Sequence, residues 1–294
     1  MNPDLAWEVW SRERSERIEN VLDGALAVAS GTPRLLLDAM RYAALGGGKR
    51  VRALLAYAGG ELTGADPDDV DGPAAAVELM HAYSLVHDDL PCMDDDALRR
   101  GKPSCHVAFG EAMALLAGDA LQTLAFEVVV RTPAGEPAAQ ITLLAKASGA
   151  SGMAGGQAID LATVGDMLAL NELEHMHALK TGALIRAAVR LGAGCGRPMR
   201  ADENDALDRY SSAIGLGFQI VDDVLDVEGT ALSLGKTAGK DAVQRKTTYA
   251  SLLGLSAARE RIEALRADAH AALGGMPTAR RLIELADWIS SRTH

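Results

Sequence analysis

The sequence predicts an all-α fold, a single domain over residues 1–294 built as a bundle of about ten helices around a central cavity. Long Ala/Leu-rich stretches repeat apolar residues at three- and four-residue spacing, which is the period of an amphipathic helix. Strand signals are nearly absent, because the one β-branched triplet, Val128-Val129-Val130, ends a helical pattern. A chain of this length buries roughly three quarters of its unfolded surface, so an interior cavity is possible.

The predicted helices are separated by segments rich in glycine, proline and polar residues. Apolar periodicity is clearest at 35–45, 74–85, 115–130 and 179–191. Breaks between helices are expected at 59–73, 132–137 and 192–198. A longer polar connection with several glycines, 229–239, is expected to act as a lid.

Composition and charge argue against several classes of protein. The chain has 294 residues, with 29 Lys and Arg against 40 Asp and Glu, a formal net charge of −11. This balance argues against a sequence-independent nucleic-acid binder, which needs a basic face. Segment 1–19 is charged throughout, and no uninterrupted apolar run approaches the roughly 20 residues that span a bilayer. We therefore expect a cytoplasmic protein without stable membrane association, with reduced thiols at Cys92, Cys105 and Cys195.

The first candidate site is a run of five aspartates within residues 88–96, at the C-terminal end of an apolar helix. The C-terminal end of a helix dipole favours cations, so the cluster calls for a positive partner. Pro91 disfavours helical geometry at Leu90, and the chain is expected to turn there and bring Asp94 back towards Asp88. Asp95 and Asp96 could instead cap the next segment.

The second candidate site is Asp222-Asp223-Val224-Leu225-Asp226, inside the apolar segment 214–227. Spacings of three and four residues place these carboxylates on one acidic helical face. Carboxylates among apolar neighbours are costly unless they are paired or bind a metal, and all-oxygen ligands suit Mg²⁺. The alternative is that each cluster is an exposed acidic turn.

Basic residues beside glycines form a third feature. Lys49 and Arg52 follow Gly46-Gly47-Gly48, and glycines allow a close approach to an anion. The spacing is not that of a P-loop. Further cations are Arg99, Arg100, Lys102, Lys180, Lys236 and Lys240. Each alone could be a surface charge, but together with the two acidic clusters they predict a metal-bridged diphosphate site.

His81 precedes Asp88 by seven residues, nearly two helical turns, so the two side chains share a face. This spacing favours a role in the site, although a lone histidine on an apolar helix can also be structural. We expect His87 and His106 to be structural.

These residues resemble the trans-prenyl diphosphate synthases, and most closely the bacterial farnesyl type. The resemblance extends from about residue 35 to residue 288. It rests on the segments "GGKRVR", "HAYSLVHDDLPCMDDDALRRGKPSCH", "GDALQTLAFE", "KTGALIRAAVRLGA", "FQIVDDVLD" and "LGKTAGKD". It implies the isoprenoid synthase type I fold and a homodimer.

The resemblance also implies a role for each site residue. Three Mg²⁺ ions per site would be held by Asp88, Asp94 and Asp222, with support from Asp89, Asp223 and Asp226. The allylic diphosphate would be bound by Arg99, Lys180 and Lys236. Isopentenyl diphosphate would be bound by Lys49, Arg52, His81 and Arg100. Oxygens of Thr181 and Gln219 would face the allylic cation, so the catalytic set is Lys180, Thr181, Gln219, Asp88 and Asp222.

The implied reaction joins isopentenyl diphosphate to dimethylallyl and then geranyl diphosphate, giving farnesyl diphosphate and free diphosphate. Mg²⁺ and the cationic side chains would stabilise the departing diphosphate, and closure of the 229–241 loop would exclude water. Tyr83, five residues before Asp88, resembles a floor that stops elongation at fifteen carbons. Geranyl and geranylgeranyl diphosphate synthases are the nearest alternatives. More remote ones are a class I terpene cyclase, a non-catalytic subunit of a heteromeric synthase and a magnesium-dependent phosphohydrolase.

Overall fold

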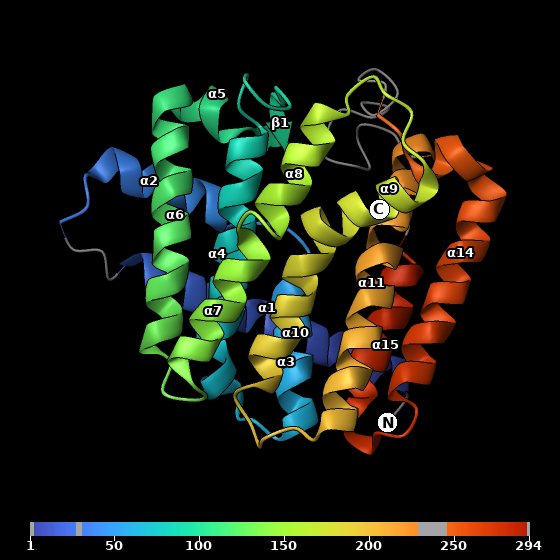
Figure 1. The fold of residues 1–294 in the computed structure, drawn as a ribbon. Helices are drawn as coiled ribbons and strands as arrows, with labels where there is room; N and C mark the ends of the chain where they lie inside the picture. Colours follow the sequence, from blue (N-terminus) through green and yellow to red (C-terminus); the bar gives the residue numbers. More distant parts are fainter. Residues whose placement is uncertain (1–2, 28–30, 229–245, 293–294) are drawn as a thin grey trace.

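The computed structural model describes residues 3–27, 31–228 and 246–292, which form the predicted all-α bundle (Figure 1). The first helices are α1 (Pro3–Ala27), α2 (Arg34–Ala44), α3 (Val51–Thr63), α4 (Pro67–Asp88), α5 (Cys105–Phe109), α6 (Glu111–Arg131) and α7 (Pro137–Ser148). The remaining ones are α8 (Met153–Ala162), α9 (Leu170–His177), α10 (Ala183–Ala193), α11 (Ala201–Glu228), α14 (Tyr249–Leu273) and α15 (Arg280–Ser290). A π-helical segment, η1 (Ala178–Gly182), joins α9 to α10, and a 3₁₀ turn, η2 (Pro277–Ala279), precedes α15.

The strands of the described ranges are two short segments after α4. β1 (Leu98–Arg99) and β2 (Lys102–Pro103) pair antiparallel as a small hairpin. Most helices run side by side along one direction, and their connections gather at the two ends of the bundle (Figure 1). The C-terminal ends of α4 and α11, which carry the two aspartate clusters, lie at the same end.

The loop expected over 59–73 is wrong in extent, because α3 continues to Thr63 and α4 begins at Pro67. Gly59 stays helical and lies against α10, where an added Cβ would lie 2.3 Å from the Val189 carbonyl oxygen. Gly192 of α10 lies as close to α3, since its Cβ would lie 1.8 Å from the Ala56 oxygen. These glycines allow two helices to cross in backbone contact rather than forming a turn.

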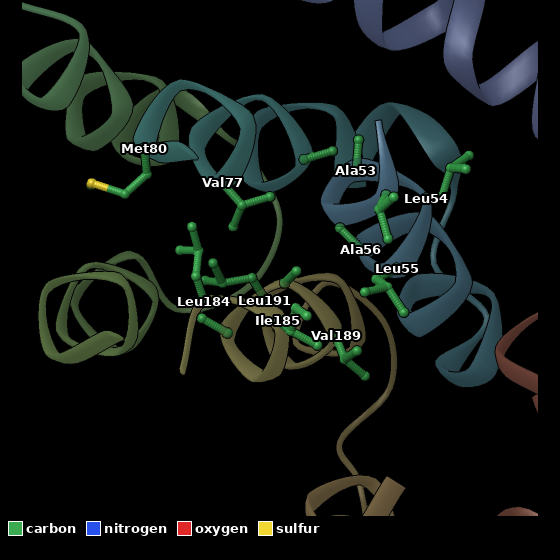
Figure 2. Close-up of a cluster of buried hydrophobic side chains, with 14 of the residues drawn as sticks. Ala53, Leu54, Leu55, Ala56, Val77, Met80, Leu184, Ile185, Val189 and Leu191 are labelled. Carbon is green, nitrogen blue, oxygen red and sulfur yellow. The ribbon is translucent and has the colours of Figure 1, made fainter. Parts of the chain in front are cut away.

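The core between α3, α4 and α10 is made of small and branched side chains (Figure 2). Figure 2 labels Ala53, Leu54, Leu55, Ala56, Val77, Met80, Leu184, Ile185, Val189 and Leu191, all of which are buried. Burying one such leucine or isoleucine contributes about 1.5–3 kcal/mol, so this contact fixes α4, which ends in the first aspartate cluster. All three cysteines are free thiols, as predicted.

Among the described helices, α6 is the one long and apolar enough to cross a membrane by length and composition. It packs against α2 and α4, and a buried core helix meets the same criteria. The helix is therefore weak evidence for a membrane span.

Candidate active site

A cavity of about 610 Å³ opens between α4, α8, η1 and α11. Ten of the residues predicted from the sequence line it: Lys49, Arg52, His81, Tyr83, Asp88, Arg99, Arg100, Lys180, Thr181 and Asp222. Lys236, Lys240 and the predicted 229–241 lid lie outside the described residues. The cavity thus brings together acidic, basic and apolar groups that the chain carries far apart.

The first aspartate cluster turns as predicted at Pro91. The Asp94 backbone N–H donates to the Asp88 carbonyl oxygen at 2.8 Å, so the two aspartates lie at the two ends of one short turn. Burial raises the pKa of Asp88 to about 6, although Lys180 opposes the shift. A carboxylate desolvated in this way is stabilised by a cation.

Asp89 and Asp96 form an ion-pair cluster with Arg99 beside the cavity. Asp89 is 2% exposed and accepts from Arg99 Nε at 3.1 Å and from Arg99 Nη2. Asp96 lies 3.4 Å from the same Nη2, and its backbone N–H donates to the Asp89 carbonyl oxygen. Arg99 is therefore held in place by two buried carboxylates, while Asp95 is exposed at a left-handed φ of 51°.

The three aspartates of the second cluster lie on one side of α11, as their spacing predicts, but their surroundings differ. Of the three, all within the described ranges, Asp222 lines the cavity. Asp223 is buried, accepts from Gln219 Nε2 at 3.0 Å and from the Tyr249 N–H at 2.9 Å, and so links α11 to the start of α14. Asp226 is also buried. The three positions fall within an arc of about 100°, and the packing of α14 against α11 gives them different neighbours.

Lys180 and Thr181 lie in η1, a π-helical segment where the apolar periodicity predicts an ordinary α-helix. The π-helical segment is contacted by glycines on two sides: a Cβ on Gly156 of α8 would lie 2.2 Å from the Lys180 nitrogen, and one on Gly215 of α11 would lie 2.9 Å from Gly182 Cα. Single π turns often mark functional sites because they change which residues face a cavity. Thr181 Oγ1 donates to Gln219 Oε1 at 3.1 Å.

Four residues of the site were missed from the sequence: Gln157, Asp160, Lys246 and Arg292. Asp160 Oδ2 accepts from Lys180 Nζ at 2.6 Å and from Lys246 Nζ at 3.0 Å, and Lys246 also reaches Asp94 Oδ1 at 3.2 Å. Burial alone would raise the pKa of Asp160, but the two lysines outweigh it and lower the pKa. A carboxylate in an otherwise apolar helix was the signal that could have identified Asp160.

Arg292, which follows α15, contacts the second aspartate cluster on α11. Its Nη2 donates to Asp222 Oδ1 at 3.0 Å, and its guanidinium lies 4.0 Å from the centre of the Phe218 ring. Cation–π contacts of this kind add to the ion pair. No local pattern near residue 292 pointed to this contact.

The basic side of the cavity carries more cations than nearby acids. Burial lowers the pKa of Arg52 to about 10, and its Nε is buried without a hydrogen-bond partner among the described residues. Burial and Arg292 lower the pKa of Lys49, and burial and Arg52 lower that of His81 well below its ordinary value. Desolvated cations that repel one another form a site for an anion.

The glycines before Lys49 allow the cationic loop to pack tightly. Arg100 Nη1 donates to the Gly47 carbonyl oxygen at 2.7 Å, and a Cβ on Gly48 would lie 2.9 Å from Arg100 Cζ. Arg50, between Lys49 and Arg52, also lines the cavity, but its side chain is buried and its guanidinium contacts Glu78 Oε2 at 3.2 Å. Its φ of 49° is left-handed, at the residue before α3 begins.

The lower cavity wall includes Tyr83 and His87. The two rings meet edge to face with centres 5.6 Å apart, and His87 Nε2 lies 3.0 Å from the Leu115 carbonyl oxygen. Tyr83 is 8% exposed. His106 lies outside the cavity lining and contacts Ser104 Oγ at the start of α5.

A preformed metal cluster is absent from the described part of the chain, where no three His, Cys, Asp or Glu side chains converge on one point. Mg²⁺ usually binds one or two carboxylates and completes its shell with waters and substrate phosphates. The donors on the two walls are all carboxylate oxygens, and Asp88 is desolvated. The residues therefore fit Mg²⁺ that enters together with a diphosphate.

Comparison with known proteins places this geometry in a family. A family model for polyprenyl synthetases matches residues 33–273. Farnesyl diphosphate synthase of Escherichia coli is 49% identical over 87% of this chain and 89% of its own length. The chloroplastic geranylgeranyl pyrophosphate synthase of Capsicum annuum is 43% identical over 97% of this chain and 79% of its own length.

A solved structure gives the same result for the fold. The geranyltransferase of Helicobacter pylori, complexed with magnesium and isoprenyl diphosphate, superposes with a TM-score of 0.85 at 30% identity. The superposition covers 98% of this chain and 97% of that one.

Proposed function

The chain belongs to the polyprenyl synthetase family, and on this basis we propose that it is a prenyltransferase that makes farnesyl diphosphate. It condenses isopentenyl diphosphate with dimethylallyl and then geranyl diphosphate, and releases diphosphate at each step. One observation carries the proposal: a single cavity joins the desolvated carboxylate of Asp88, an excess of basic side chains and apolar side chains. A diphosphate with an isoprenoid tail matches these three surfaces.

The proposed cofactor is Mg²⁺, with three ions per site held by Asp88, Asp94 and Asp222. When bound, it would supply positive charge to the oxygens of the allylic diphosphate. Asp89 supports the site by holding Arg99, and Asp223 supports it by holding Gln219. Asp226 is proposed to support the second wall from its buried position.

The proposed diphosphate sites divide the basic residues into two groups. Arg99 and Lys180, with Lys236 from beyond the described residues, bind the allylic diphosphate beside the aspartates. Lys49, Arg52, His81 and Arg100 bind isopentenyl diphosphate on the other side of the cavity. Neutral His81 donates a hydrogen bond there, since its lowered pKa leaves it uncharged at neutral pH.

The proposed reaction begins when the bond between the allylic carbon and the diphosphate oxygen breaks. The electron pair leaves with the diphosphate, whose charge Lys180 and Arg99 stabilise. Oxygens of Thr181 and Gln219, joined by a 3.1 Å hydrogen bond, face the allylic cation. The isopentenyl double bond then attacks this cation, and the product loses a proton to the departed diphosphate.

Tyr83 is proposed to set the product length, because its ring lies in the lower wall beside His87. A geranylgeranyl diphosphate synthase is the second candidate, and the 43% identical Capsicum annuum relative favours it. The terpene cyclase and the non-catalytic subunit are less well supported, since both aspartate walls are intact and the relatives named above are synthases.

The proposed assembly is a cytoplasmic homodimer of single-domain chains without nucleic-acid or stable membrane association. Exposed apolar side chains on α5 and α6 support a protein contact there: Val107, Leu115, Leu116 and Val130. A second copy of the chain would cover this apolar surface.

The test incubates the protein with isopentenyl diphosphate and each of dimethylallyl, geranyl and farnesyl diphosphate, with and without Mg²⁺. We expect a fifteen-carbon diphosphate from the first two primers and no product without Mg²⁺. A twenty-carbon product would favour the geranylgeranyl synthase, and cyclic hydrocarbons would favour the cyclase. No condensation with any primer would overturn the proposed function.

A further inference from the structure

Gln157 is a buried polar residue whose hydrogen-bonding groups have no partner. It lies on α8, lines the cavity and is 8% exposed. Neither its Oε1 nor its Nε2 makes a hydrogen bond with any residue that the structure describes. Buried amides without partners cost stability, and persistent ones in a native protein call for an explanation.

The position of Gln157 along α8 places it between two chemically different parts of the cavity. Asp160, three residues later, binds Lys180 and Lys246, so the charged groups lie at the C-terminal end of α8. Met153 and Ala154, three to four residues earlier, line an apolar part. At a rise of about 1.5 Å per residue, Gln157 lies about 4.5 Å from Asp160 along the axis of α8.

Gly156, the residue before Gln157, brings this part of α8 against η1, the segment that carries Lys180. A Cβ on Gly156 would lie 2.2 Å from the Lys180 nitrogen and 2.5 Å from its Cα, so the two backbones are in direct contact. The oxygen of the other amide in the site, Gln219, already accepts from Thr181. The Gln157 oxygen, in contrast, accepts from no donor of the described residues.

We propose that Gln157 is a further catalytic residue, whose amide oxygen contacts the allylic carbons as positive charge develops on them. The inference rests on the proposed function. A diphosphate bound to Lys180 would lie near Asp160. Its first allylic carbons would then lie about one helical turn further along α8 towards Met153, beside Gln157. As the carbon–oxygen bond breaks and the electron pair leaves with the diphosphate, the amide dipole stabilises the cation without forming a bond.

This role accounts for a buried amide that has no partner among the described residues. An oxygen that is already oriented and carries no hydrogen bond does not have to be released before it can face a cation. A buried amide without a protein partner costs stability, as expected for a residue kept for activity rather than for stability.

The test compares Gln157→Met with Gln140→Met as a matched control. Gln140 is also buried with an unpartnered Oε1, but it lies on α7, and its Nε2 donates to the Ala134 oxygen at 3.3 Å. For Gln157→Met we expect kcat to fall by at least about tenfold, as when one aligned dipole is removed from an active site. The KM values for both substrates and the product length stay unchanged, and Tm stays equal or rises.

Gln140→Met should lower Tm and leave kcat unchanged. A Gln157→Met variant with wild-type kcat, or one that loses Tm and only as much activity as its unfolded fraction explains, would overturn the proposal. If Gln157→Met does not fold, Gln157→Glu decides: it keeps an oxygen and should retain measurable kcat, whereas complete loss with wild-type Tm would contradict the oxygen's role. A wild-type protein that makes no condensation product would contradict the proposed function instead.

Discussion

Side chains around the cavity fall into groups that are already paired within the protein and groups that are not. Asp160 holds two lysines, and Asp89 holds Arg99, so these residues are fixed before any ligand arrives. Arg52 Nε and the amide of Gln157 are buried without partners among the described residues. Paired residues give the site its shape, and unpaired ones have capacity left for substrate.

His177 gives a pH-dependent stability at the residue scale. It is 6% exposed, both ring nitrogens lack a partner in the described structure, and its ring stacks on Tyr249. Burial, then Lys180, lower its pKa to about 4. Between pH 6.5 and 4 the unfolded chain binds a proton that the folded protein does not, so stability falls as pH falls, by up to about 3 kcal/mol.

The variant His177→Phe should lose less stability over this pH range, because phenylalanine keeps the ring contact and cannot titrate. Denaturant unfolding at pH 7 and pH 4.5 measures the difference between variant and wild type. Equal losses in the two proteins would show that His177 does not contribute.

Tyr83 gives a prediction for product length. Replacing Tyr83 by Ala removes the ring that contacts His87 in the lower wall and deepens the cavity. We expect products longer than fifteen carbons, resolved by chromatography after complete turnover. An unchanged product length would mean that another residue stops elongation.

At the scale of helices, the position of η1 depends on its close contacts with α8 and α11. The π-helical η1 lies between Gly156 of α8 and Gly215 of α11, each without room for a side chain. Any larger residue pushes a helix away from the segment that carries Lys180. The arrangement explains why glycines lie within helices here, where they otherwise cost helix stability.

Gly156→Ala should therefore reduce both stability and activity. Overpacking of this kind costs about 1–3 kcal/mol, and displacement of Lys180 should lower kcat at saturating substrate. Gly24→Ala is the control: its Cβ would meet nothing within 4 Å in α1, and it should stabilise the protein by about 0.5–1 kcal/mol without changing kcat. Thermal unfolding and steady-state kinetics test both, and a Gly156→Ala protein with normal Tm and kcat would contradict the argument.

At the scale of the whole molecule, cations from the C-terminal part of the chain pair with aspartates of both walls. Lys246 contacts Asp94, and Arg292 contacts Asp222. The ion pairs join segments 152 and 70 residues apart. These cations lie next to carboxylates that are proposed to bind Mg²⁺.

Arg292→Ala should increase the affinity of the unliganded protein for Mg²⁺, because no guanidinium competes for Asp222. The Asp222 side chain is 38% exposed, so the pair is worth at most about 1 kcal/mol and the gain in affinity about fivefold. Calorimetric titration with Mg²⁺ measures this. Arg186→Ala, which breaks an exposed pair with Asp208, should leave the affinity unchanged. A weaker affinity in Arg292→Ala would contradict the competition.

The amino-acid sequence was enough to predict the helical class, the two aspartate clusters and most of the cations that line the cavity. These features follow from short-range patterns: a helical period, a proline that turns the chain at residue 91, and charges beside glycines. The turn that returns Asp94 to Asp88 was predicted for the same reason. Local chemistry was enough wherever the deciding neighbours are close in sequence.

Which of these residues line the cavity, and which others join them there, depends on how the helices pack. Asp222 lines the cavity while Asp223 binds the start of α14. Arg52 Nε has no partner among the described residues, whereas the Arg50 guanidinium is paired with Glu78. The Asp160 carboxylate pairs with Lys246, which lies 86 residues later in the chain. Helical spacing fixes the angle between side chains on one helix but not the helices packed around it, and burial and charge at each position depend on that packing.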